Sequence, residues 1–248
     1  MKLYVYCLVE LTQTLPDALH GIGGVLVRRL EIADFCFLVS DFAERVVPVT
    51  RENALAHAAV VQSVLKVTTP LPLRFGTLTA EQQLQNYAHA KREALHAKLE
   101  QVRGCVEMNV KIISDRDWME ASPAINTQES PGTAFLSEKR REILGGEARG
   151  AEAKHVAEWL EGQLRDLVSG KDIKTDPAAS VNSTAKALGK LLLTGAFLVE
   201  RERVEEFRNK AHEVRRQRPD LHFLVSGPWA PYSFTNMDLE FKTHFGVS

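Results

Sequence analysis

The sequence predicts an α+β fold with two domains, each an antiparallel sheet with helices packed on it. In the first 113 residues the strand-like runs come in near-adjacent pairs instead of alternating with helices, which is typical of antiparallel sheets. A polar, proline-bearing stretch follows at 114–132, where we expect the domain junction. Residues 133–248 then have the order helix, strand, strand, helix, strand, which suits a modified ferredoxin-like sheet with a C-terminal tail.

The first domain, residues 1–113, divides into strands and helices by its hydrophobic period. Side chains in 3–10 alternate between two faces, which predicts a strand. Residues 24–42 predict a hairpin of two strands, and the alanine- and leucine-rich residues 52–66 predict a helix. Residues 80–102 predict a second helix, because apolar side chains recur there at helical spacing. That stripe contains Leu84, Ala88, Leu95, Leu99 and Val102.

The last strand predicted for this domain, residues 105–113, alternates clearly between apolar and polar side chains. We expect the apolar set to point into the core and the polar set to point outward. The inward set is Val106, Met108, Val110 and Ile112, and the outward set is Glu107, Asn109 and Lys111.

The second domain begins with a long helical segment, residues 133–170, which Gly145 and Gly146 are expected to bend or interrupt. A short strand at the start of 171–189 and a strand buried on both faces at 190–200 follow. Residues 201–220 predict an amphipathic helix, and 221–227 predict the final strand. The inward stripe of that helix is Val204, Phe207, Ala211 and Val214.

The composition is that of an ordinary globular protein, with 44% hydrophobic and 25% charged residues. A net charge of −1 supplies no field that favours nucleic acid or an anionic membrane, so neither is expected as a partner. The longest apolar run is too short to span a bilayer. The three cysteines lack metal or disulfide spacing, so we expect them to be buried small hydrophobes in a reducing compartment.

No familiar catalytic or phosphate-binding motif occurs in the sequence. The eight histidines do not have the helical spacing of a metal pair, so no catalytic residue, metal or cofactor is predicted. The basic run Arg215–Arg218 closes a helix that opens with glutamates, which indicates compensation of the helix dipole more than a nucleic-acid contact.

Arg74 is the first candidate site residue, because it lies between the apolar residues Leu73 and Phe75 and follows the rigid Pro72. If the segment is buried, the guanidinium needs partners. An internal ion pair or a brace on a backbone carbonyl is the favoured interpretation, and a clamp for an anion or carboxylate is the alternative.

The second candidate is the segment "GPWAPYSF", where Gly227 is expected to end the final strand. Pro228 and Pro231 cannot donate to a sheet and make the chain stiff there. We expect Trp229, Tyr232 and Phe234 to be buried against the body of the protein, so that the segment is a structural clasp. An exposed aromatic patch that grips a hydrophobic partner is the alternative.

Four pieces, "LYVYCLV", "PLPLRFGT", "AFLVERERVEEFR" and "GPWAPYSF", come in an order that resembles the gas vesicle protein F and L family, from residue 3 to about residue 235. The proline–phenylalanine–glycine and Gly-Pro-Trp pieces are the specific ones, and the helices between them are generic. The family pattern is matched at Gly227, Pro228, Trp229, Pro231, Tyr232, Ser233 and Phe234. Ala230 stands where the family often has a proline.

The resemblance implies a non-enzymatic protein needed to build gas vesicles, located at the vesicle and assembled in the cytoplasm. It implies as partners the small, very hydrophobic major shell protein and other gas vesicle accessory proteins. Structural or partner-binding roles then fall on Arg74, Phe75, Gly76, Gly227, Pro228, Trp229, Pro231, Tyr232 and Phe234. Two other classes stay open: a ferredoxin-like module that binds or senses a small molecule, and an enzyme without a familiar motif.

Overall fold

The computed structural model describes residues 2–11, 15–116, 131–175 and 190–235. The chain divides into two compact units, one of Met1–Glu107 with Gly227–Ser248 and the other of Met108–Ser226. The division therefore falls before the expected junction, most of which (117–130) lies outside the described residues. The C-terminal segment, expected in the second domain, groups with the first unit.

The first unit contains an antiparallel sheet with the strand order β2-β3-β1-β4, and β5 pairs with β1 as well. Its strands are β1 (Lys2–Glu10), β2 (Arg28–Ile32), β3 (Phe35–Phe42), β4 (Leu71–Pro72) and β5 (Leu78–Thr79). The expected hairpin is confirmed, because β2 and β3 pair antiparallel around a tight turn. The central strands β1 and β3 supply the bulk of the core, including Tyr4, Tyr6, Phe35 and Phe37.

The described part of this unit contains the α-helices α1 (Arg51–Leu65), α2 (Glu81–Ala90) and α3 (Arg92–Val102). The side chain of Thr50 caps α1 by accepting a hydrogen bond from the backbone N–H of Asn53 at 3.2 Å. The single helix expected over 80–102 is instead two, with a break at Lys91. All five residues of the expected apolar stripe are nevertheless buried.

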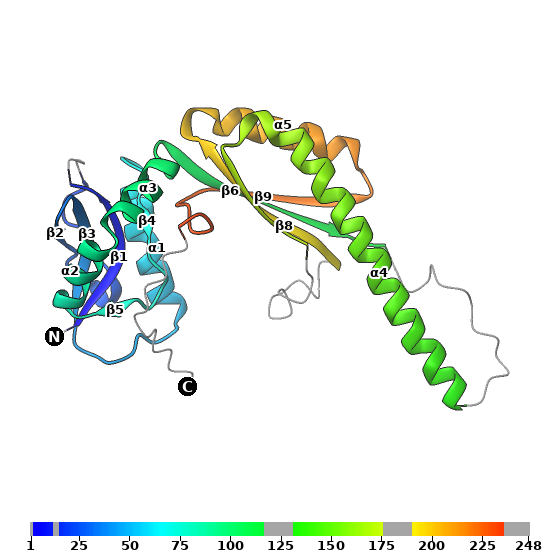
Figure 1. The fold of residues 1–248 in the computed structure, drawn as a ribbon, viewed down its shortest axis with the longest axis horizontal. Helices are drawn as coiled ribbons and strands as arrows, with labels where there is room; N and C mark the ends of the chain where they lie inside the picture. The colour runs from blue at the N-terminus through cyan, green and yellow to red at the C-terminus, as the bar shows by residue number, and fades with distance from the viewer. Residues whose placement is uncertain (1, 12–14, 117–130, 176–189, 236–248) are drawn as a thin grey trace. The chain divides into compact units, whose positions relative to one another are not determined.

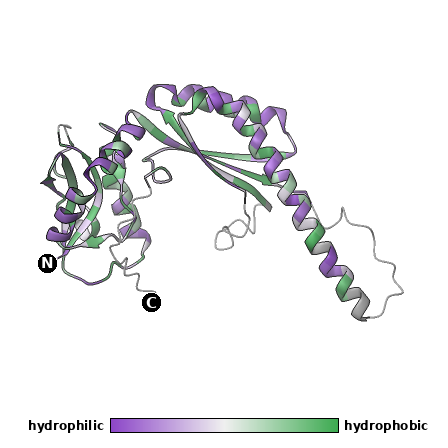
Figure 2. Ribbon diagram, in the orientation of Figure 1, coloured by the Kyte–Doolittle hydropathy of each residue, from purple (hydrophilic) through white to green (hydrophobic). Residues whose placement is uncertain are grey.

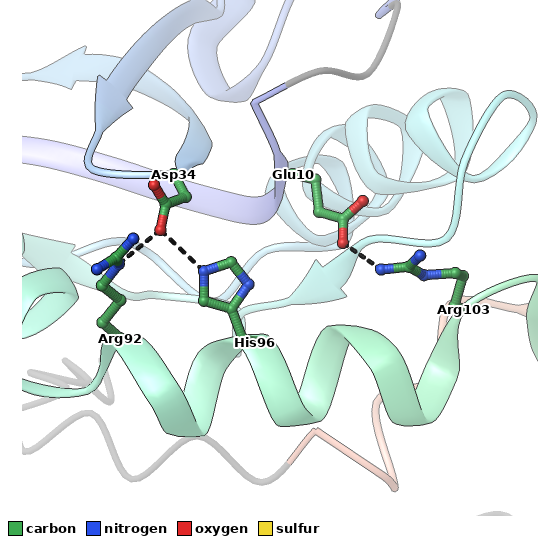
Figure 3. A network of polar contacts seen from close by, with 5 residues as sticks. All are labelled: Glu10, Asp34, Arg92, His96 and Arg103. Atoms are coloured by element: carbon green, nitrogen blue, oxygen red, sulfur yellow. Dashed lines mark hydrogen bonds and ion pairs between the residues drawn. The ribbon is translucent and has the colours of Figure 1, made fainter.

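Polar contacts join α3 to the ends of the strands (Figure 3). Asp34, in the turn between β2 and β3, accepts from Arg92 Nε at 2.5 Å and contacts His96 Nε2 at 2.9 Å. Glu10, at the end of β1, pairs with Arg103 Nη2 at 2.5 Å. The bonds from Arg92 and then His96 lower the pKa of the Asp34 carboxyl. Because these contacts are exposed to solvent, each contributes little to stability.

The second unit is built on a sheet with the strand order β7-β8-β6-β9. The strands are β6 (Cys105–Ser114), β7 (Gly170–Lys174), β8 (Lys190–Glu200) and β9 (Leu221–Trp229), and β7 pairs antiparallel with β8. The helix α4 (Pro131–Leu164) follows β6, and α5 (Val204–Gln217) precedes β9. The strand at 105–114, expected in the first domain's sheet, therefore belongs to this one.

Both helices pack against β8 and against each other (Figure 1). The expected interruption of the long helix at Gly145–Gly146 is wrong, because α4 runs through both glycines over 34 residues. The expected inward stripe of α5 is confirmed, since all four of its residues are buried. Hydrophilic and hydrophobic residues alternate along α5 in Figure 2, as in an amphipathic helix.

Two further observations concern the cysteines and the helices. The three cysteines are buried and form no disulfide, as expected. Among the described residues, no helix is long and apolar enough to cross a membrane.

Candidate functional site

The centre of the candidate site is His57, a residue of α1 that is only 4% exposed. Its Nδ1 lies 2.8 Å from the hydroxyl of Tyr4 on β1, and its Nε2 lies 3.1 Å from the hydroxyl of Tyr232. A neutral imidazole that accepts at Nδ1 and donates from Nε2 satisfies both nitrogens. Burial lowers the pKa of His57 to about 4, although the nearby carbonyl of Leu73 opposes the shift, so the ring is neutral at physiological pH.

The first candidate segment, residues 71–77, folds onto this histidine. Gly76 has a φ of 85° and donates its backbone N–H to the Tyr4 hydroxyl at 3.1 Å. A side chain there would strain the backbone, so glycine lets the chain approach the hydroxyl closely. The ring of Phe75 contacts the rings of Tyr4 and His57 edge-on, with centroids 6.4 and 5.9 Å apart. The turn is closed by Thr77 Oγ1, which donates to the carbonyl of Arg74 at 2.6 Å.

Arg74 itself is exposed, while its neighbour Leu73 is buried and Phe75 is half-buried. The turn at 74–77 explains the difference, because it directs the side chain of Arg74 away from the core. The expected internal ion pair required the side chain of Arg74 to be buried, and it is exposed.

The second candidate segment, Gly227–Phe234, is fastened at both ends. Strand β9 does not end at Gly227 as expected but continues through Pro228 to Trp229. The carbonyl of Pro228 accepts a hydrogen bond from Gln62 Nε2 of α1 at 3.2 Å. Ala230 and Pro231 are buried beyond the strand, and the chain then turns. Small and rigid residues therefore supply the contact with the protein body.

Glu107 is the main anchor of the turn that follows. This residue of β6 was expected to point outward, but it is 4% exposed. Its carboxylate accepts from the backbone N–H of Ser233 at 2.8 Å and from Ser233 Oγ at 3.0 Å. Glu107 keeps its place in the alternation of β6, but hydrogen bonds from Ser233 cover its side chain. A carboxylate that accepts two hydrogen bonds is a strong tether for a turn.

The large aromatic side chains of the segment are less buried than expected. Trp229 is 45% exposed and Tyr232 40%, whereas Phe234 is half-buried. The expectation that Trp229 packs into the body is therefore wrong, because Gln62, His57 and Glu107 hold its neighbours through polar contacts instead. Hydrogen bonds hold the segment in place, and Trp229 is partly exposed to solvent.

Tyrosine hydroxyls surround the imidazole of His57 in this arrangement. Both nitrogens of His57 are occupied by tyrosine hydroxyls, and burial raises the pKa of both phenols. In the part of the chain that the structure describes, no group of histidine, cysteine and carboxylate side chains could hold a metal ion.

Sequence reasoning missed the residues that bring the two segments together. His57 is a lone histidine in an alanine-rich helix, and Gln62 is one turn and a half further on, so neither has a distinctive pattern. Glu107 was assigned by strand alternation, which identifies the face but not what covers it. Of the nine predicted site residues, Phe75, Gly76 and Tyr232 contact the Tyr4–His57 pair directly.

Comparison with known proteins decides the family. Residues 2–236 match the family described as gas vesicle synthesis protein GvpL/GvpF. The chain belongs to this family. The resemblance inferred from its sequence motifs is thereby confirmed, and the GvpL/GvpF match includes both candidate segments.

Curated relatives carry the names of both branches of the GvpL/GvpF family. Gas vesicle protein L of Streptomyces sp. (strain CB03234) is 26% identical over 251 residues, which cover 94% of this chain and 92% of that protein. Gas vesicle protein F of the same strain is 30% identical over 243 residues, which cover 94% and 99%. Similarity to both does not assign the chain to one branch.

Two solved structures share the fold. GvpF from Microcystis aeruginosa aligns with a TM-score of 0.73 at 20% identity, covering 95% of this chain and 99% of that one. GvpF from Anabaena sp. PCC7120 aligns with a TM-score of 0.71 at 19% identity, covering 100% and 99%. The mixed fold of helices and antiparallel sheet is therefore that of known GvpF structures.

Proposed function

We propose that this protein is a non-enzymatic accessory or minor structural component of gas vesicles, needed for their assembly in the cytoplasm, and that it binds the small hydrophobic shell protein. Family membership supports the gas vesicle role. Other gas vesicle proteins are proposed as further partners. The exposed Trp229 is the observation that carries the binding proposal.

Trp229 is suited to such a contact for two reasons. Tryptophan is enriched among the residues that dominate binding energy, because it removes a large apolar area from water at low entropic cost. Its neighbours are held by Gln62, His57 and Glu107, so the ring is presented from a segment that is already ordered. A preordered contact loses less entropy when a partner binds. Phe75 and Gly76 contribute by holding the Tyr4–His57 pair.

We also propose a ferredoxin-like architecture for the second sheet. The element order β6-α4-β7-β8-α5-β9 and the strand order β7-β8-β6-β9 support it. In this proposal β-augmentation, in which a partner strand pairs with an exposed sheet edge, is a second route to the shell subunit.

A module that binds or senses a small molecule is the alternative function. It predicts a pocket of convergent polar groups beside Arg74. The grooves described below are lined by α5 and β9 and do not include Arg74. A thermal-shift screen of metabolites with the wild type and Arg74→Met separates the two functions, because only the alternative predicts a ligand whose stabilisation depends on Arg74.

Co-purification tests the main proposal. The tagged chain is co-expressed with the major shell protein, and the retained shell protein is quantified for the wild type, Trp229→Ala and Leu55→Ala. Leu55 is a matched control, because it is an exposed apolar residue on α1. We expect Trp229→Ala to reduce retention at least tenfold, since truncating a binding hot spot costs about 2 kcal/mol or more. Leu55→Ala should change retention less than twofold.

The melting temperature of each variant completes the experiment. Because Trp229 is 45% exposed, Trp229→Ala should melt within a few degrees of the wild type. Unchanged retention would contradict the proposal. A collapse of the melting temperature together with lost retention would show that the tryptophan acts by supporting the fold.

A further inference from the structure

The sheets of the two units differ in how their edge strands are protected. In the first unit the edge β2 has two arginines and a glutamate among five residues, and β4 and β5 are two residues long. In the second unit the edge β7 has two lysines and an aspartate among five residues. Short length and charge are the usual devices that stop an edge from pairing with another chain.

Strand β9 lacks these devices over residues 221–225, before Pro228 near its end. It is nine residues long, it lies at the other edge of the second sheet, and β6 is its neighbour among the described strands. Its sequence, LHFLVSGPW, contains a histidine and no aspartate, glutamate, lysine or arginine. Leu224 is 48% exposed and Val225 is 39% exposed. Residues 221–225 therefore form an apolar edge of the kind that a partner strand can extend.

A basic groove runs beside this edge, between β9 and α5. One part has a volume of about 360 Å³ and is lined by Arg208, His212 and Arg215 of α5 and by Phe223, Leu224 and Val225 of β9. An adjoining part of about 800 Å³ shares His212 and Arg215 and adds Arg216 and His222. Among the residues that the structure describes, no aspartate or glutamate lines either part.

The charges around the groove are only partly compensated. Arg208 pairs with Glu205, and His222 lies 2.6 Å from Asp115. Over the described residues, no ion pair is recorded for Arg215 or Arg216. Cations at the end of a helix offset its dipole, but here they also line a groove along a strand edge. The groove therefore favours an anionic occupant.

We propose that this groove binds an extended acidic segment of a partner polypeptide, which adds to β9 as a further strand. The acidic side chains of the added strand, at alternate positions, face α5. The apolar side chains between them lie on the other face of the sheet, beside Leu224. The strand is long enough, because Arg208 and Arg215 are about 10 Å apart along the helix and three alternate residues of a strand span about 13 Å. The inference is independent of the contact proposed for Trp229.

Synthetic peptides test the proposal with the full chain. A labelled seven-residue peptide of alternating glutamate and valine should bind by fluorescence anisotropy. A peptide of the same composition with its four glutamates consecutive should bind at least tenfold more weakly, and so should an alternating lysine–valine peptide. Equal binding of the alternating and consecutive acidic peptides would show that only charge is recognised and would overturn the proposal.

Backbone methylation tests strand addition directly. Methylating the nitrogens of every second residue blocks one edge of the peptide strand, and methylating the other set blocks the opposite edge. Addition to β9 uses one edge, so one methylated peptide should lose binding and the other should keep it. Identical behaviour of the two would contradict an added strand.

Charge reversal locates the site. Arg215→Glu should weaken binding of the alternating acidic peptide at least tenfold. Lys210→Glu reverses a charge on the same helix, at a residue outside both parts of the groove. This variant should change the affinity for the peptide less than twofold. Circular dichroism checks that both variants are folded. Tighter binding of single-stranded polyuridylate with the same dependence on Arg215 would identify a nucleic-acid groove and overturn the proposal.

Discussion

His57 makes the stability of the first unit depend on pH. Burial lowers its pKa from 6.5 to about 4, so the unfolded chain binds the proton more tightly than the folded chain. The stability that the neutral ring contributes is complete above pH 6.5, falls as the pH drops towards 4, and changes no further below that. A shift of this size corresponds to about 3 kcal/mol.

The variant His57→Phe isolates this effect, because it keeps a ring but removes the titration. We expect the free energy of unfolding, measured with urea, to fall between pH 6.5 and 4 more steeply in the wild type than in the variant. At pH 7.5 the variant should be the less stable protein, since it lacks the bonds to Tyr4 and Tyr232. Parallel curves across the window would show that His57 does not titrate as described.

Glu107 carries a second residue-scale prediction. Glu107→Ala removes both hydrogen bonds to Ser233 and should lower the free energy of unfolding by about 2 kcal/mol. Lys111→Ala is the matched control on the same strand, because Lys111 is exposed, and should change stability by about 0.5 kcal/mol or less. Urea midpoints measure both, and equal effects would contradict an anchoring role for Glu107.

At the scale of elements, replacing two glycines that have different backbone conformations is expected to change stability in opposite directions. Gly146 lies within α4, where a methyl group would meet no atom within 4 Å. Gly146→Ala should therefore stabilise the protein by about 0.5–1 kcal/mol through helix propensity. Gly104 is equally open but has a φ of 70°, so Gly104→Ala should destabilise it by about 1–2 kcal/mol. Thermal unfolding compares the two, and a shared sign would refute the argument.

Helices and strands could be predicted from the sequence where one side of the element is buried, because that side requires apolar residues at a regular spacing. The stripes of α5 and of residues 84–102 follow from helical spacing, because packing against a sheet requires a continuous apolar face. Their ends and breaks were less predictable. Lys91 is a good helix former and gives no sign of the break between α2 and α3. The adjacent Gly145 and Gly146 of α4 weaken the helix but do not stop its propagation from the residues on either side.

At the scale of the whole molecule, the candidate site depends on contacts between residues far apart in sequence. His57 and Tyr232 are separated by 175 positions, and Glu107 and Ser233 by 126. Hydrophobic period identifies faces of single elements but not the segments that cover them. For the same reason the C-terminal segment was assigned to the second domain, whereas it groups with the first unit.

The two specific segments nevertheless became intelligible once the fold was known. The turn at Gly76 bonds to the hydroxyl of Tyr4, and Tyr232 bonds to the ring of His57. Their residue types follow from that role: glycine for close approach, proline for stiffness and tyrosine for a hydroxyl. Arg74 and Trp229 are exposed, and this internal role does not explain either residue.

Site-specific photo-crosslinking from position 229 tests the central claim most directly. A photoreactive phenylalanine analogue replaces Trp229 in one strain and Leu55 in another, and cells assembling gas vesicles are irradiated. We predict that the major shell protein is crosslinked from position 229 and not from position 55. Crosslinks from position 229 that never include the shell protein, in cells that form vesicles normally, would contradict the account.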